Sequence, residues 1–145
     1  RHPDGTWRDA RRFGLPPAHP SLTILRFDGP LHFVNAATFE DAVLAVEREH
    51  PRLKVLLISS AGINDIDASG IDTLRRLHRQ LTASGRLLAC CGLKKQVIDV
   101  LERTGLWAEL GPHAAYRHED DALPHLLPLL GAAPPAAPIR RGLEW

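Results

Sequence analysis

The fold class of this 145-residue chain follows from the stretch VLLISSAGINDIDASGI, residues 55–71. Its first four residues are all apolar, which is typical of a strand that is buried on both faces of a parallel sheet. A polar loop over residues 59–68 follows this strand. Beyond the loop, the spacing of one set of residues predicts a helix that stops near Gly85. These residues are Ile71, Leu74, Leu77, His78 and Leu81. We therefore expect a strand–loop–helix unit of an α/β domain.

Further elements of the same kind are expected downstream of this unit. The pattern predicts a strand over residues 86–91, a helix that ends at Thr104-Gly105, a short strand over residues 114–117 and a helix that starts with the acids at Glu119. Cys90 and Cys91 are neighbours in the first of these strands. Adjacent strand residues point to opposite faces, so we expect two small buried side chains and no disulfide between them.

An antiparallel hairpin is expected upstream. Strand-forming residues at 22–27 and 31–34 flank the turn signal Asp28-Gly29-Pro30. The helix that follows should start near a capping box of Thr38 and Asp41, with Asn35 as a competing cap, and should end at Pro51. Its polar face should turn three acids towards water, at Glu40, Glu47 and Glu49.

Together these elements predict one α/β domain over residues 21–130. Its mixed β-sheet would open with the antiparallel hairpin, continue with parallel βα units and pack against about four helices. Residues 1–20 show no sustained periodicity and are expected to be a linker. Residues 131–145 are rich in Ala and Pro and are expected to be a disordered tail.

The composition argues against a nucleic-acid-binding protein and against a membrane-spanning segment. Eighteen Lys and Arg residues oppose seventeen Asp and Glu residues, a net charge of +1, whereas a dedicated nucleic-acid binder needs a basic excess. No apolar run approaches the about 20 residues that a membrane-spanning helix requires. The chain contains no Met, even at its first position, so we expect it to be a piece of a longer protein.

The residue patterns give no support for catalysis. The eight His residues form no metal-binding motif, and Ala68-Ser69-Gly70 lacks the pattern of a nucleophile elbow. Asp65 and Asp67 have no partner acid at a recognisable spacing. The sequence therefore predicts no catalytic residue, no cofactor and no metal ligand, and the chain is not expected to be an enzyme.

Residues 62–72 form the most distinctive candidate site, because α/β proteins usually bind ligands where a strand ends and a helix begins. The backbone of a helix N-terminus favours an anion, but Asp65, Asp67 and Asp72 would repel a phosphate. The alternative is that Asp67 or Ser69 simply caps the helix.

Basic residues gather on and after the same helix, at Arg75, Arg76, Arg79, Arg86, Lys94 and Lys95. This cluster is either a solvated face or a docking surface for an acidic protein or an anionic membrane. Arginines also outnumber acids in residues 1–12, which fits a linker on the cytoplasmic side of a missing transmembrane region.

The chain resembles the STAS domain, and specifically the version found at the C-terminus of SulP anion transporters. Residues 24–36, ILRFDGPLHFVNA, are similar to the opening of SulP-type domains, and residues 66–70, IDASG, are similar to the loop motif of all STAS domains. Residues 1–9 resemble the segment that links the last membrane helix to the domain. The resemblance extends over residues 1–130, and residues 21–130 would be the STAS domain itself.

This resemblance implies a regulatory or protein-interaction domain at the cytoplasmic face of a sulfate or bicarbonate transporter, membrane-proximal but not inserted. One alternative is a stand-alone anti-sigma-factor antagonist that works by partner switching. Such antagonists carry a phosphorylated Ser directly after the loop Asp, where this chain has Ala68, and their chains would begin near Ser21. A weaker alternative, by analogy with relatives, is a nucleotide-sensing module at the loop.

We predict that the loop over residues 61–69 and the following helix form the docking surface. The partner would be the transporter's own transmembrane domain, a second STAS copy or a soluble acidic protein, and not a nucleic acid. The residues expected at this surface are Asp65, Asp67, Ser69, Gly70, Asp72, Arg75, Arg76 and Arg79.

Overall fold

The computed structural model describes residues 19–131, so the predicted linker and tail lie almost wholly outside the described residues. The helices and strands follow one another as β1 (Leu22–Asp28), α2 (Phe33–Glu49), β2 (Val55–Gly62), α3 (Ala68–Ala83), β3 (Leu87–Cys91), α4 (Lys95–Arg103), α5 (Leu106–Leu110), the 3-10 turn η1 (Gly111–Ala114), α6 (Glu119–Leu126) and the 3-10 turn η2 (Leu127–Leu130). This order confirms an α/β domain.

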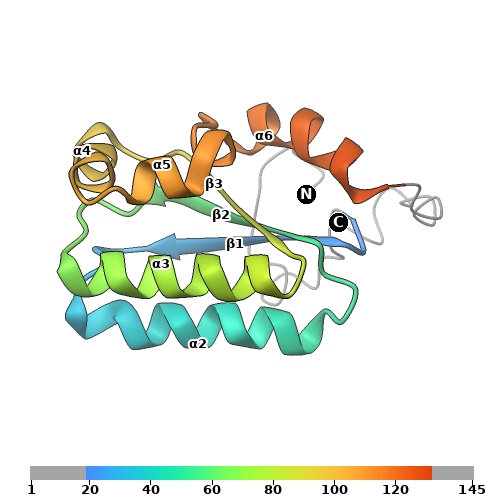
Figure 1. The fold of residues 1–145 in the computed structure, drawn as a ribbon, viewed down its shortest axis with the longest axis horizontal. Coiled ribbons are helices and arrows are strands. Elements are labelled where there is room, and N and C mark those ends of the chain that lie inside the picture. Colours follow the sequence, from blue (N-terminus) through green and yellow to red (C-terminus); the bar gives the residue numbers. More distant parts are fainter. Residues whose placement is uncertain (1–18, 132–145) are drawn as a thin grey trace, which may run out of the picture.

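The three strands form a parallel sheet in the order β1-β2-β3, with β2 at the centre. The side chains of β2 point alternately into two hydrophobic cores, one on each face of the sheet. Leu56 and Ile58 belong to the larger core, shared with α2 and α3, and Val55 and Leu57 belong to the smaller core under α6. Figure 1 shows α2 and α3 side by side along one side of the sheet and α6 on the other. The apolar run at residues 55–58 is therefore buried on both faces, as expected for a central parallel strand.

The predicted opening hairpin is wrong for the described residues. β1 pairs in parallel with β2, and of residues 31–34 only Leu31 makes a strand contact, a single parallel bridge to Ile66. Phe33 is already the first residue of α2. The local residues favour a strand, but α2 starts early because its first N–H group binds a carboxylate 34 residues further along the chain, at Asp67.

Capping of α2 also differs from the expectation. The N-cap residue is His32, which makes no side-chain cap hydrogen bond, and the Asn35 side chain instead donates to the Pro30 carbonyl at 2.8 Å. Glu47 does not face water, because it is half-buried and paired with Arg86 at 2.8 Å. The sequence pattern could not reveal this pair, whose members lie on α2 and immediately before β3.

Downstream elements follow the prediction with one exception and one addition. The third helix, α4, ends at Thr104-Gly105 as predicted, where Gly105 has φ of +79°, and the short helix α5 follows it. The strand expected at residues 114–117 is reduced to one bridge between Cys91 and Tyr116. Cys90 and Cys91 are both free thiols that point into opposite cores, as expected, and burial raises the pKa of each to about 12.

Candidate functional site

The β2–α3 loop and the start of α2 form one continuous surface. The Leu31 N–H donates to the Asp65 carbonyl at 2.9 Å, and the Asp67 N–H donates to the Leu31 carbonyl at 3.3 Å. These bonds hold the loop beside the segment that leads into α2. Both helices thus begin at the edge of the sheet where the parallel strands end, the place where α/β folds carry their sites.

Asp67 joins the two helices through a single carboxylate. Its Oδ1 accepts the Gly70 N–H at 2.8 Å, which makes Asp67 the N-cap of α3, and its Oδ2 accepts the Phe33 N–H at 3.0 Å. The pKa of Asp67 lies below its ordinary value of 3.8, because the Gly70 and Phe33 N–H groups stabilise the charged form. The sequence left Asp67 and Ser69 as rival caps, and the structure assigns this role to Asp67.

The lowered pKa gives Asp67→Asn a pH-dependent effect. A carboxyl group whose pKa is lower in the folded state stabilises the fold fully above its ordinary value of 3.8, and this contribution is lost as the pH falls through the folded pKa. We expect Asp67→Asn to lower the free energy of unfolding at neutral pH. The difference from the parent chain should shrink as the pH falls from about 4 to about 2.

Urea denaturation across this pH range measures the difference. Asp72→Asn is the matched control, because Asp72 is an exposed carboxylate on the same helix. The control should stay within about 0.5 kcal/mol of the parent chain at neutral pH. An Asp67→Asn effect that does not change with pH would show that the charge of Asp67 is not what stabilises the two helix ends.

Asp65 lies at the outer surface of the loop. Its Oδ2 is 2.8 Å from His32 Nε2, and its Oδ1 accepts the neighbouring Ile66 N–H at 2.9 Å. The Asp65 side chain is 61% exposed, so it remains open to a partner despite the contact with His32. Asp72, one turn into α3, is also exposed, and Ser69 is half-buried in the first turn.

Gly70 is buried where α3 crosses the chain that leads into α2. A Cβ atom at this position would overlap the Leu31 carbonyl oxygen and would lie 2.8 Å from Ile66 Cγ1. Glycine is thus required here for the close approach of two backbones, and not for an unusual φ angle. Gly70 shapes the site without presenting a group to a partner.

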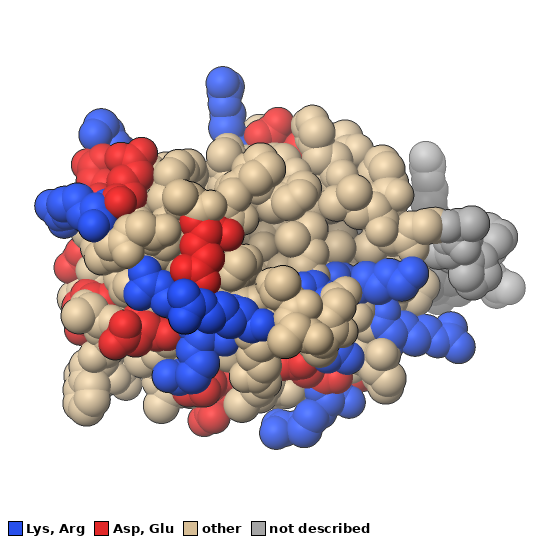
Figure 2. Space-filling view, in the orientation of Figure 1, with Lys and Arg blue, Asp and Glu red and all other residues tan. Residues whose placement is uncertain are grey.

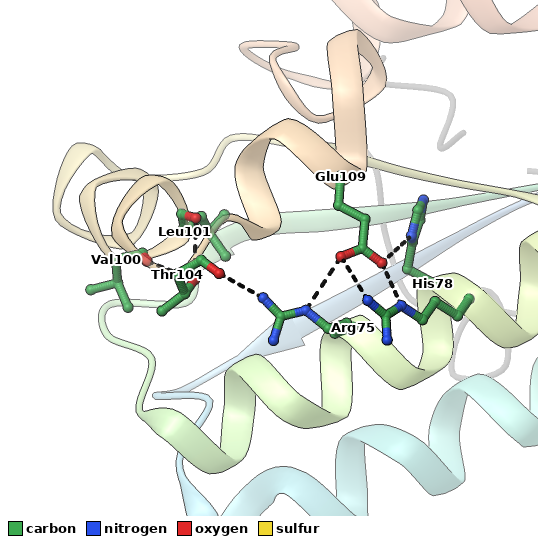
Figure 3. A network of polar contacts seen from close by, with 7 residues as sticks. Arg75, His78, Val100, Leu101, Thr104 and Glu109 are labelled. Atoms are coloured by element: carbon green, nitrogen blue, oxygen red, sulfur yellow. Dashed lines mark hydrogen bonds and ion pairs between the residues drawn. The ribbon is translucent and has the colours of Figure 1, made fainter.

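The three predicted arginines are already paired within the domain. Arg79 Nε and Arg75 Nε lie 2.7 Å and 3.3 Å from the two oxygens of Glu109 on α5, and Arg76 lies 2.8 Å from Glu40 on α2. Figure 3 shows the Glu109 carboxylate facing Arg75 and His78, with Arg75 reaching on to the Thr104 carbonyl. Hydrogen bonds from Arg79 and Arg75 hold the pKa of Glu109 below its ordinary value of 4.5.

The basic cluster is therefore not one uniform basic face. On the face drawn in Figure 2, Lys and Arg side chains alternate with Asp and Glu side chains. The arginines of α3 hold α5 and α2 in place, and a partner would have to compete with Glu109 and Glu40 for them.

Two apolar residues that the sequence analysis assigned to a strand belong to the exposed surface instead. Phe33 and Val34 are 77% and 83% exposed at the start of α2, beside the loop that carries Asp65. One signal could have revealed them, since Ala36, Phe39 and Val43 have helical spacing from directly after Asn35. That spacing leaves no room for a complete strand before the helix.

The surface offers contacts but little enclosed volume. The cavity beneath the loop has a volume of about 10 Å³, room for about one water molecule. Within residues 19–131, no group of three or more His, Cys, Asp or Glu residues could hold a metal ion. None of the helices in this range has the length and apolar character needed to cross a membrane.

Comparison with known proteins assigns this chain to a protein family. The STAS domain family model matches residues 16–122, and the chain belongs to this family. A relative from Mycobacterium tuberculosis, "Probable sulfate transporter MT1781", is 28% identical over 93 residues, covering 63% of this chain and 17% of its own length. The chain spans about a fifth of the length of the curated sulfate transporters that it matches.

Solved structures agree with this assignment. A sulfate transporter family protein from Wolinella succinogenes is 27% identical with a TM-score of 0.66, over 80% of this chain and 89% of its own. The SulP transporter STAS domain from Vibrio cholerae, 21% identical, has a TM-score of 0.65 over 85% and 94% of the two chains and shows the shared fold. The resemblance to SulP-type STAS domains is confirmed.

Anti-sigma-factor antagonists share the fold as well. The antagonist SpoIIAA in its unphosphorylated form is 12% identical with a TM-score of 0.58, over 78% of this chain and 96% of its own. This likeness concerns the fold alone.

Proposed function

We propose that this chain is the cytoplasmic regulatory and protein-interaction domain of a SulP-type secondary anion transporter, with sulfate or bicarbonate as the transported anion. The domain would act on transport without forming the transport path. Support comes from the STAS family assignment and from relatives that are sulfate transporters. The observation that carries the proposal is the exposed pair Phe33 and Val34 beside the STAS loop.

The partner proposed for this surface is the transporter's own transmembrane domain. Apolar side chains mark an interaction site where they form an exposed, contiguous patch, and Phe33 and Val34 are neighbours that are each more than three-quarters exposed. Next to them, Asp65 supplies a negative charge at the outer side of the loop. A matching surface would therefore combine apolar side chains with a basic residue, and such a contact needs no enclosed pocket.

Replacing both apolar residues in the full-length protein tests this proposal. We expect Phe33→Ser with Val34→Ser to change the rate of radiolabelled sulfate uptake severalfold, because the contact between the two domains is lost while the exposed positions leave the fold intact. The matched control is Leu127→Ser with Leu129→Ser, which alters an exposed apolar pair on η2. Uptake that is unchanged in the first variant, at equal amounts in the membrane, would contradict the proposal.

The face of α3 that carries Arg75, Arg76 and Arg79 remains a second predicted docking surface. Replacing Arg75, Arg76 and Arg79 together with Glu would place new carboxylates against Glu109 and Glu40, so a change in uptake could come from lost stability. Arg76→Ala alone is the cleaner test, since Arg76 is 54% exposed and, within residues 19–131, forms its one ion pair with Glu40.

Partner switching of the anti-sigma type is the alternative function, favoured by the shared fold. Ala68, the first residue of α3, offers no hydroxyl group for phosphorylation. Incubation of the chain with an anti-sigma kinase and labelled ATP tests this alternative. Stoichiometric labelling at Ser69 would support it, and no labelling would argue against it. Titration with GTP or ATP tests the nucleotide-sensing alternative in the same way.

A further inference from the structure

A second concave site is lined by residues that follow β3, by α4 and α5, and by the end of η1 with the segment after it. It adjoins the β2–α3 loop, because its lining residue Lys94 also donates to Asn64 of that loop. The hollow is widely open to solvent, and its volume of about 420 Å³ is within the range of small-molecule sites of roughly 300–1,000 Å³. Among residues 19–131, nine line this site, and none of these nine is acidic. Lys94 belongs to the basic cluster expected from the sequence, but the pocket has no part in the proposed function.

The apolar part of the pocket suits a flat ring. Trp107 of α5 and Tyr116 both line it, together with Leu93 and Ile98. Trp107 and Tyr116 are half-buried, so part of each remains accessible. Aromatic side chains in such a position provide a large contact area for a planar ligand.

The polar part of the pocket is cationic. Lys94 and Arg117 both line it, and Arg117 is exposed. The Lys94 ammonium group donates to the side-chain oxygen of Asn64, a neutral partner, so an arriving anion need not displace a carboxylate from it. Asp121 accepts the backbone N–H of Arg117 at 2.9 Å but does not line the pocket. Two cationic groups beside an apolar wall favour an anion with an apolar body.

We propose that this pocket binds an organic anion that carries an aromatic ring. The ring would lie against Trp107 and Tyr116, and the acid group would be bound by Lys94 and Arg117. This site is separate from the loop at Asp67–Gly70 and does not depend on the transport proposal. It can be tested on the 145-residue chain itself.

Benzenesulfonate is the probe that combines the two required features. Titrated into the 15N-labelled chain, it should cause saturable amide shifts centred on Gly92–Lys94 and Tyr116–Arg117, with a shift of the Trp107 indole N–H. A dissociation constant of about 1 mM is expected for a ligand of this size. Benzenesulfonamide, which is neutral, and inorganic sulfate, which has no ring, should each bind about tenfold more weakly.

Variants separate the pocket from general charge attraction. Lys94→Gln with Arg117→Gln should weaken benzenesulfonate binding about tenfold or more, because both charge-assisted contacts are removed. Lys94 makes no side-chain cap on α4, so the change should leave the helix intact. Lys95→Gln is the matched control, since Lys95 is the next residue, pairs with Asp99 and does not line the pocket. It should change the affinity by less than about twofold.

The proposal is overturned if no saturable shifts occur up to about 20 mM probe, a concentration that would saturate a site of the expected affinity. It is equally overturned if the double variant binds as well as the parent chain, or if benzenesulfonamide or sulfate binds as tightly as benzenesulfonate.

Discussion

Gly70→Ala should lower the free energy of unfolding by about 2–3 kcal/mol. The added methyl group would overlap the carbonyl oxygen of Leu31 and press on Ile66 Cγ1, so α3 would have to move away from the chain leading into α2. Gly70 lies in a helix, where helix propensity alone predicts that Ala stabilises by up to about 1 kcal/mol. The sign of the measured change therefore separates the two explanations.

Urea denaturation of three variants makes this comparison. Ser69→Ala is the neighbouring control and should stay within about 0.5 kcal/mol of the parent chain. Gly85→Ala is the glycine control, because its φ is +76° but no atom of the described residues lies within 4 Å of an added Cβ. It should cost about 1 kcal/mol, the strain of the left-handed conformation alone. A Gly70→Ala chain as stable as the parent would contradict the close approach of the loop and α3.

Glu109→Ala should cost about 1–2 kcal/mol. The change removes the acceptor that Arg75 and Arg79 share and leaves Arg75 with the Thr104 carbonyl. Glu109 is 26% exposed and Arg79 is 67% exposed, so water screens part of the loss and the larger figures for fully buried pairs do not apply. α5 should loosen from α3 before the rest of the domain unfolds.

Glu40→Ala is the matched control for this network. Arg76, its partner, is more than half exposed, and such surface pairs contribute about 0–1 kcal/mol. Thermal unfolding of both variants, at low and high salt, measures the two contributions. Glu109→Ala should lower the stability more than Glu40→Ala, and added salt should reduce the loss caused by Glu109→Ala less. Equal effects would show that Glu109 does not hold α5 in place.

The central part of the fold could be predicted from sequence because its signals are local. Four apolar residues at 55–58 indicate a strand buried on both faces, and the spacing from Ile71 to Leu81 indicates the helix after it. The partner of β1 could not be predicted in this way. The hairpin signal around Asp28-Gly29-Pro30 is genuine turn chemistry, but Phe33 and Val34 belong to α2, whose first N–H group binds Asp67, far along the chain.

In the candidate site too, features that depend on local sequence could be predicted, and features that depend on tertiary structure could not. The sequence offered Asp67 and Ser69 as candidate caps of α3, and the structure selects Asp67. The second role of Asp67, as acceptor of the Phe33 N–H group, depends on tertiary structure. The exposure of Phe33 and Val34 does so as well. The arginines were recognised as a cluster, but Glu109 lies about 30 residues away on a five-residue helix, and sequence spacing cannot show that it pairs with them.

Fractionation of the source cells, followed by a blot with an antibody raised against this chain, tests the proposed function most directly. We expect a band in the membrane pellet that is much larger than the 16.0 kDa of the chain. Uptake assays with the Phe33 and Val34 variants would then follow. A band of about that smaller mass in the soluble fraction would contradict the transporter assignment.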